Sequence, residues 1–242
     1  KTTRGMRVYL KTPRLVGLLA VTLAAAAGSA MVIVNTVVIV KNMGRSEGDV
    51  ALALAAYGAG SMLAALALPR ILTGVKDRTV MIFGAALLVA TLAAIGLVFG
   101  QLGTQPLWPF LLVGWLAMGI GYSLCVTPSG RLLKRSSADE DRPALFAAQF
   151  ALSHVCWLVA YPMAGQIGAR FGMTPTFLVL AALGILGVGL TLWLWPRKDP
   201  SMLYHTHPEL PSDHPHLQEH GSDGHRHHFV IDDLHVGWPG KV

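Results

Sequence analysis

Six long stretches without charged residues limit what this chain can fold into. Each has about 20 residues or more, contains no Asp, Glu, Lys or Arg, and is rich in Ala, Val, Leu, Ile and Gly. About 20 apolar residues in a helix cross the hydrocarbon core of a bilayer. We therefore predict six membrane-spanning segments, at Leu15–Val40, Val50–Leu68, Val80–Gly100, Leu107–Thr127, Pro143–Ala169 and Met173–Trp195.

The composition supports a helical membrane protein and argues against other classes. Charged residues make up 13% of the chain, about half the share in a typical soluble domain. A membrane β-barrel needs strands in which apolar and polar residues alternate, and stretches such as "FGAALLVATLAAIGLVFG" do not alternate. Both cysteines, Cys125 and Cys156, lie inside predicted spans, so no disulfide framework is indicated. The predicted fold class is all-α, with six transmembrane helices.

The basic residues predict the orientation of the spans. Connections rich in Lys and Arg tend to stay in the cytoplasm. Of the 19 Lys and Arg residues, only Lys41, Arg45 and Arg170 lie on one side, and the other sixteen lie on the side of the two termini. Both termini are therefore expected in the cytoplasm. The net charge of +6 follows from this asymmetry and does not indicate a nucleic-acid partner.

Polar residues are concentrated in the first, fourth and fifth spans, whereas the third and sixth are almost purely apolar. A helix with polar residues needs a bundle interior or a water-filled cavity, so the first, fourth and fifth spans are expected to line a substrate pathway. His154 is the only histidine within a span. Interhelical hydrogen bonding is the alternative role for all of these side chains. The candidate pathway residues are Asn35, Thr36, Tyr122, Gln149, Ser153, His154 and Tyr161.

Several segments resemble one transporter family. The six-span layout, together with "LPRILTGVKDRTVMIFG", "AMVIVNTVVIV" and "TPSGRLLKRSS", is similar to the C-terminal six-helix half of a major facilitator superfamily transporter of the efflux type. That family has a Gly-x-x-x-Asp-Arg-x-Gly-Arg-Arg signature, of which only Asp77 and Arg78 match, because Thr73 stands at the first glycine position and Val80, Met81 and Ile82 at the last three.

The resemblance carries several expectations. It implies an MFS-type half-bundle of two three-helix repeats in a bacterial-like inner (plasma) membrane. It implies a secondary transporter of a small molecule or ion that needs no cofactor and that works with an N-terminal six-helix half, either upstream of Lys1 or on a separate chain. Asp77 and Arg78 are expected to form a cytoplasmic latch between helix ends, and a solvated loop pair is the alternative. No grouping of nucleophile, base and orienting residue indicates an enzyme.

The remaining feature is a histidine-rich C-terminal segment. Imidazoles two residues apart can chelate one ion from an extended chain, and they suit zinc, nickel and copper. No fixed Cys/His spacing of a structural zinc site is present, so weak binding is expected. Metal efflux aided by this tail, a membrane-anchored metal-binding scaffold or a non-transporting remnant, and a tail with no task all remain open. The candidate ligands are His205, His207, His214, His216, His220, His225, His227 and His228.

The predicted organisation has three parts: a basic cytoplasmic segment at 1–14, a transmembrane domain at 15–195, and a tail at 196–242. The tail has too little apolar surface to fold alone and is expected to be largely disordered. Its last part, "HHFVIDDLHVGW", contains apolar residues that a free tail would not need. We therefore expect this part to dock on the membrane domain or on a partner.

Overall fold

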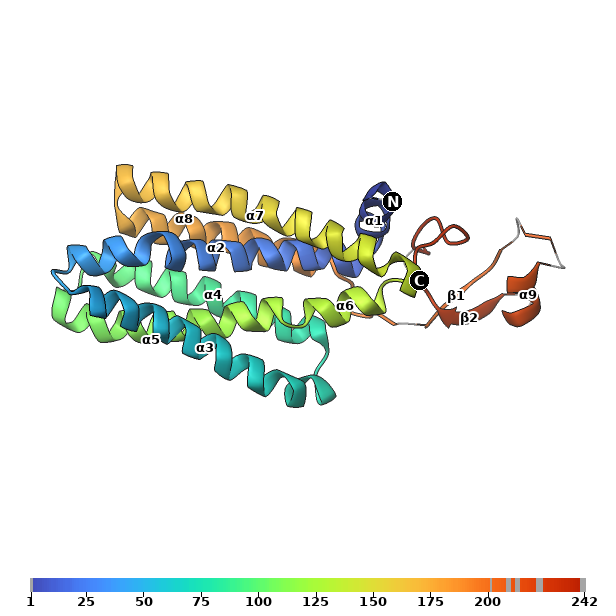
Figure 1. Ribbon diagram of the computed structural model, residues 1–242, viewed down its shortest axis with the longest axis horizontal. Coiled ribbons are helices and arrows are strands. Elements are labelled where there is room, and N and C mark those ends of the chain that lie inside the picture. Colours follow the sequence, from blue (N-terminus) through green and yellow to red (C-terminus); the bar gives the residue numbers. More distant parts are fainter. Residues whose placement is uncertain (1, 201, 208–209, 212–213, 221–223, 240–242) are drawn as a thin grey trace.

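The computed structural model is a bundle of six long antiparallel helices (Figure 1). It describes all residues except 1, 201, 208–209, 212–213, 221–223 and 240–242. All six helices are long and apolar enough to cross a membrane, which confirms the predicted all-α membrane fold. They are α2 (Pro13–Asn42), α3 (Glu47–Gly74), α4 (Asp77–Phe99), α5 (Thr104–Val126), α7 (Arg142–Phe171) and α8 (Met173–Leu194).

Short elements lie outside these helices. The basic segment before α2 forms helix α1, and a break at Thr127 and Pro128 separates α5 from α6. The tail contains two paired strands and a short helix. These elements are α1 (Thr2–Lys11), α6 (Ser129–Arg135), the 3₁₀ helix η1 (Asp139–Asp141), β1 (Met202–His205), α9 (Pro215–His220) and β2 (His225–His228).

The packing of the helices follows a two-fold pattern. Helix α2 packs on α7 and α8, and helix α5 packs on α3 and α4. Exchanging the first triplet (α2, α3, α4) with the second (α5, α7, α8) converts each of these contacts into another observed contact. Two inverted three-helix repeats have this property. The exposure of the helices differs, because most of α2 is enclosed by its neighbours whereas little of α3 is buried.

Glycines permit the closest contact in the bundle, where α3 crosses α5. A Cβ atom added to Gly119 would lie 1.9 Å from the carbonyl oxygen of Tyr57, and one added to Gly60 would lie 2.0 Å from the carbonyl oxygen of Leu116. The two backbones therefore touch directly. In lipid, helices associate through such packing of small residues, since apolar burial gives little drive between helices.

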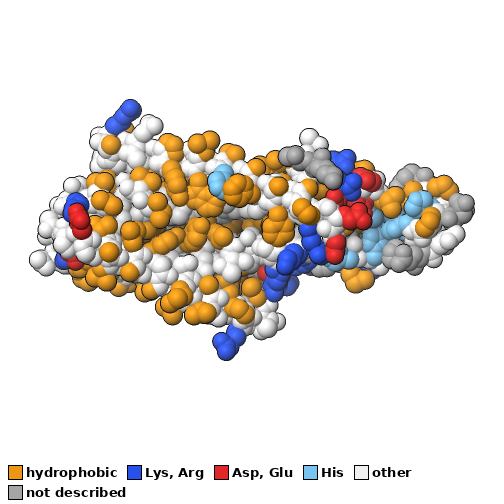
Figure 2. Space-filling view, viewed as in Figure 1, with side chains coloured by type: hydrophobic (Ala, Val, Ile, Leu, Met, Phe, Trp, Pro, Cys, Tyr) orange, Lys and Arg blue, Asp and Glu red, His pale blue; other side chains and the backbone are white. Residues whose placement is uncertain are grey.

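The two ends of the bundle carry different groups. Helices α1 and α6 and the tail lie at one end, which we call the terminal end, and the turns that join α2 to α3, α4 to α5 and α7 to α8 lie at the other (Figure 1). Lys and Arg side chains gather at the terminal end, and histidines gather in the tail beyond it (Figure 2). Such an arrangement follows from an even number of spans.

The described part of the tail contains regular structure. Strands β1 and β2 pair in antiparallel fashion, with Leu203 opposite His227 and His205 opposite His225. Phe229 and Ile231 are buried, and they join the hydrophobic core that contains Val8 of α1. Phe229 and Ile231 therefore pack on the rest of the chain, as expected for the docking of this segment, whereas Met202, Tyr204, Leu234 and Val236 of the tail are exposed.

Candidate functional site

Asn35 and Thr36 of α2 lie inside the bundle, where their polar groups bond to other helices. The Asn35 amide donates to the carbonyl oxygen of Ala164 in α7 at 3.2 Å. The Trp115 indole in α5 donates to the Thr36 hydroxyl at 2.8 Å. Both side chains are almost fully buried. These bonds agree with the interhelical role that the sequence leaves open for both side chains, and most of α2 is enclosed by the other helices.

The three candidates in the first half of α7 do not form one site. The Gln149 amide oxygen accepts a hydrogen bond from the Tyr9 hydroxyl of α1. Ser153 is buried and bonds to the Phe150 carbonyl oxygen. The exposed His154 side chain also bonds to that carbonyl oxygen, through Nδ1 at 2.7 Å. Of the three, only His154 is placed to meet a molecule outside the half-bundle.

Tyrosines from three helices lie near one another. The rings of Tyr57 in α3 and Tyr122 in α5 lie 6.0 Å apart between centroids. Tyr161 of α7 lies near enough to both for the phenolic groups to interact electrostatically, and its side chain is exposed. Tyr122 and Tyr161 are among the pathway residues predicted from the sequence, and Tyr57 is not. In the sequence, Tyr57 is marked only by being the single tyrosine of a helix that is rich in Ala, Gly and Leu.

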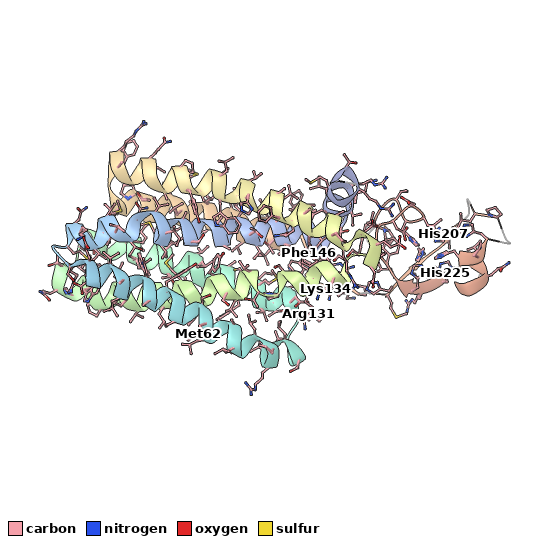
Figure 3. All side chains as sticks on the ribbon, in the orientation of Figure 1. Met62, Arg131, Lys134, Phe146, His207 and His225 are labelled. Carbon is pink, nitrogen blue, oxygen red and sulfur yellow. The ribbon has the colours of Figure 1, made fainter. Side chains whose placement is uncertain are left out.

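At the terminal end, Asp77 is held by basic residues of α6. Its carboxylate accepts from Arg131 at 2.6 and 3.0 Å, and Arg135 lies 3.9 Å away. Arg135 also pairs with Asp199 at 2.5 Å. Figure 3 shows Arg131 on α6 at this end of the bundle. These ion pairs connect the start of α4, helix α6 and the segment that follows α8.

Arg78, the other residue of the matched signature, contributes differently. Its Nε donates to the carbonyl oxygen of Trp195, at the end of α8, at 3.0 Å. Both Asp77 and Arg78 border a cavity of about 300 Å³. The cavity is basic, because Lys76, Arg131, Arg135 and Arg197 also line it and Asp199 is the other acidic group. The aspartate and the arginine therefore each tie α4 to a different helix end.

Histidines of the tail come together beyond the terminal end (Figure 3). Successive side chains of a strand point to opposite faces, so the strand pair places His205, His225 and His227 on one face, and His207 continues it. His216 of α9 and His235 complete the group. We call these six residues the histidine cluster. The ligand atoms of two overlapping quartets lie within 4.8 Å of one another: His205, His216, His225 and His227, and His205, His207, His216 and His235.

A comparison with known families identifies the membrane domain. Residues 17–219 match the Major Facilitator Superfamily, and this range covers most of the chain and the six long helices except the first turn of α2. The chain belongs to the major facilitator superfamily. No curated protein matches it. As a major facilitator superfamily member, the chain is an integral multi-pass membrane protein with the framework of a secondary transporter.

Within this major facilitator protein, the predicted metal ligands divide into three groups. His205, His207, His216, His225 and His227 belong to the histidine cluster. His214 accepts a bond from the His216 amide at 3.2 Å and is not in either quartet, and His228 is on the other face of β2, where burial and then the charges of Arg14 and Arg135 lower its pKa. The side chain of His220 is outside the described residues.

His235 is the member of the histidine cluster that our predicted ligand set omitted. It is remote in sequence from the "HTH" and "HRHH" runs, so spacing gave little signal. The preceding "DD" was the only hint, because Asp232 accepts from His235 Nδ1 at 2.8 Å. The fold brings His235 to within 3.0 Å of His205, measured between the Nε2 atoms.

Proposed function

We propose that this major facilitator protein exports a small solute by alternating access, using an ion gradient. The observation that carries the proposal is the convergence of Tyr57, Tyr122 and Tyr161 from three helices. Aromatic rings with a polar group can contact an organic solute through both the ring face and the hydroxyl. His154 of α7, whose ring centroid lies 4.0 Å from that of Phe150, adds an exposed side chain with hydrogen-bonding nitrogens to this helix.

The proposed orientation places the terminal end in the cytoplasm. This end carries α1, α6 and the tail, where the Lys and Arg side chains gather (Figure 2), and basic connections are retained on the cytoplasmic side. The Asp77–Arg131 pair then acts as a latch, because it joins α4 to α6 and must loosen if the helices rock. An inner-membrane location in a bacterial cell is part of the same proposal.

The proposed partner is a second six-helix body that packs on the tyrosine-bearing side of α3 and α7. Large apolar side chains stay exposed on both helices, among them Leu66 on α3 and Leu158 on α7, at 66% and 73% exposure. Lipid covers such side chains equally well, so the tyrosines are the stronger argument. A pathway between two bodies exposes their hydroxyls to water and solute.

A second candidate is export of a divalent metal cation of the nickel or zinc type. The histidine cluster favours it, because imidazole is a preferred ligand of these metals. The tail would then collect cytoplasmic cations near the entrance of the pathway. If the protein transports no solute, the alternative function is a six-helix membrane scaffold that binds metal.

A tolerance panel tests these functions. Cells with and without the full natural gene are compared for growth with nickel, zinc, cobalt, copper and a set of organic toxicants, and then for efflux of the solute that separates them. We expect Tyr161→Ala to lower the efflux rate about tenfold, which corresponds to losing about 1.4 kcal/mol of contact in the transition state.

Ile185→Ala is the control for Tyr161→Ala, since it removes an exposed side chain of α8, a helix that carries none of the three tyrosines. It is expected to leave efflux near the wild-type rate. Equal efflux by both variants would contradict a role for the tyrosine group. No difference in tolerance or efflux on removal of the gene would argue for the scaffold.

A further inference from the structure

The spacing of the imidazoles in the histidine cluster matches that of metal ligands. The Nε2 atoms of His205 and His235 are 3.0 Å apart, and those of His216 and His225 are 3.1 Å apart. Zn–N bonds of about 2.0–2.1 Å put the ligand atoms of a tetrahedral site roughly 3.3 Å from one another. In the quartet of His205, His207, His216 and His235 all ligand atoms lie within 4.8 Å of one another, so a contraction of at most about 1.5 Å brings them to this spacing.

Hydrogen bonds at the opposite ring nitrogens orient the imidazoles. Nδ1 of His205 is 3.2 Å from the carbonyl oxygen of Leu203, and Nδ1 of His235 is 2.8 Å from the Asp232 carboxylate. Because an oxygen acceptor requires a proton on Nδ1, the lone pair is on Nε2, the atom that faces the cluster. Metal-binding histidines are held by carboxylates and carbonyls in this way.

The ligands of the histidine cluster also differ in burial. The side chain of His235 is 4% exposed, and His207 is also buried. The quartet of His205, His207, His216 and His235 thus contains two buried ligands, whereas the other quartet contains one.

The segment that carries His235 is fixed to the membrane domain. Asp233 pairs with Arg4 of α1 at 2.9 Å, and the Val236 carbonyl oxygen accepts from Lys11 at 2.7 Å. The Trp238 ring lies 4.8 Å from the Arg14 guanidinium at the start of α2. Residues 229–238, which we call the docking segment, therefore touch the cluster on one side and α1 and α2 on the other.

We propose that His205, His207, His216 and His235 hold one divalent transition-metal cation of the zinc or nickel class, and that this ion ties the tail to α1 through the docking segment. The ion is a resident of the tail rather than the cargo, so the proposal does not depend on what the protein transports. When the ion is bound, His235 of the docking segment coordinates it together with His205, His207 and His216. The ion therefore adds a direct link between these three histidines and the segment that contacts α1.

The binding test uses the purified full chain in detergent, titrated with zinc alone and with nickel alone against a chromophoric chelator. We expect one tightly held ion per chain. The double variant His207→Ala/His235→Ala is expected to lose affinity by more than the roughly 10- to 100-fold that loss of an outer hydrogen-bond partner produces. His214→Ala/His228→Ala, which removes two histidines outside the cluster, is expected to bind like the wild type.

Adjacent aspartates provide a finer test of geometry. Asp232→Asn weakens the hold on the His235 ring, and we expect zinc affinity to fall about 10- to 100-fold. Asp233→Asn removes the partner of Arg4 and Arg7 without touching the cluster, so its zinc affinity should remain that of the wild type. The two variants have the same change in charge and composition.

Hydrogen exchange of the α1 amides tests the tie. In the wild type, zinc should slow exchange across α1, and in Asp233→Asn zinc should bind without slowing it. Wild-type zinc affinity in His207→Ala/His235→Ala, or a loss confined to His225→Ala/His227→Ala, would overturn the assigned ligands. Zinc binding that leaves α1 exchange unchanged in the wild type would overturn the tie.

Discussion

Gly119→Ala is expected to destabilise the bundle where α3 crosses α5. The new Cβ would lie 1.9 Å from the Tyr57 carbonyl oxygen and 2.9 Å from the Ser61 amide nitrogen. Both are backbone atoms, so no side chain can rotate away and the two helices must separate. Overpacking of this kind costs about 1–3 kcal/mol in free energy of unfolding. Thermal unfolding in detergent, followed by circular dichroism, measures the loss.

Gly58→Ala is the control for this prediction. Gly58 is also in α3, and a Cβ atom there has no neighbour within 4 Å. Alanine favours helix over glycine, so this variant should melt at or slightly above the wild-type temperature. If Gly119→Ala and Gly58→Ala melt together, the close crossing of α3 and α5 is not a feature of the folded protein.

Asp77→Asn is expected to loosen the terminal end and to lower transport. The Asp77 side chain is 5% exposed and neutralises the Arg131 guanidinium. Without its charge, Arg131 and the nearby Arg135 lose their acidic partner at the start of α4. Because Arg131 is half exposed, water takes over part of the interaction, and we expect a loss of about 2 kcal/mol in free energy of unfolding.

The matched control is Asp139→Asn. Asp139 pairs with Arg142 at 2.8 Å, but its side chain is 84% exposed, and exposed pairs contribute little. Thermal unfolding should separate the two variants by several degrees. Efflux of the solute found in the tolerance panel should fall only in Asp77→Asn. Equal melting and equal efflux in both variants would show that the Asp77–Arg131 pair is no latch.

The polar residues show why a substrate pathway is hard to read from sequence. Asn35 and Tyr161 look alike as polar positions in apolar helices. The first donates to Ala164 inside the bundle and the second is exposed beside two other tyrosines. Whether such a residue is buried in an interhelical hydrogen bond or exposed at the surface depends on which helices surround its own helix. That information comes from packing between distant segments, and Tyr57 is absent from the predicted pathway residues for the same reason.

The histidines show the same limit at short range. The alternation in "HTH" and "HRHH" correctly suggested imidazoles on one side of an extended chain, and the β1–β2 pairing places them so. Spacing could not reveal that His214 and His228 stay out of the cluster or that His235 enters it, since these outcomes depend on α9 and on the docking segment.

The six helices and the crowding of basic residues at one end were determined by the sequence alone. Uncharged stretches of this length must satisfy their backbone groups within a helix in lipid, whatever surrounds them. The tertiary structure alone decided which polar side chains are buried, which tyrosines meet, and that His235 joins the histidine cluster. These features arise from contacts between residues far apart in the chain, and local composition carries no record of such contacts.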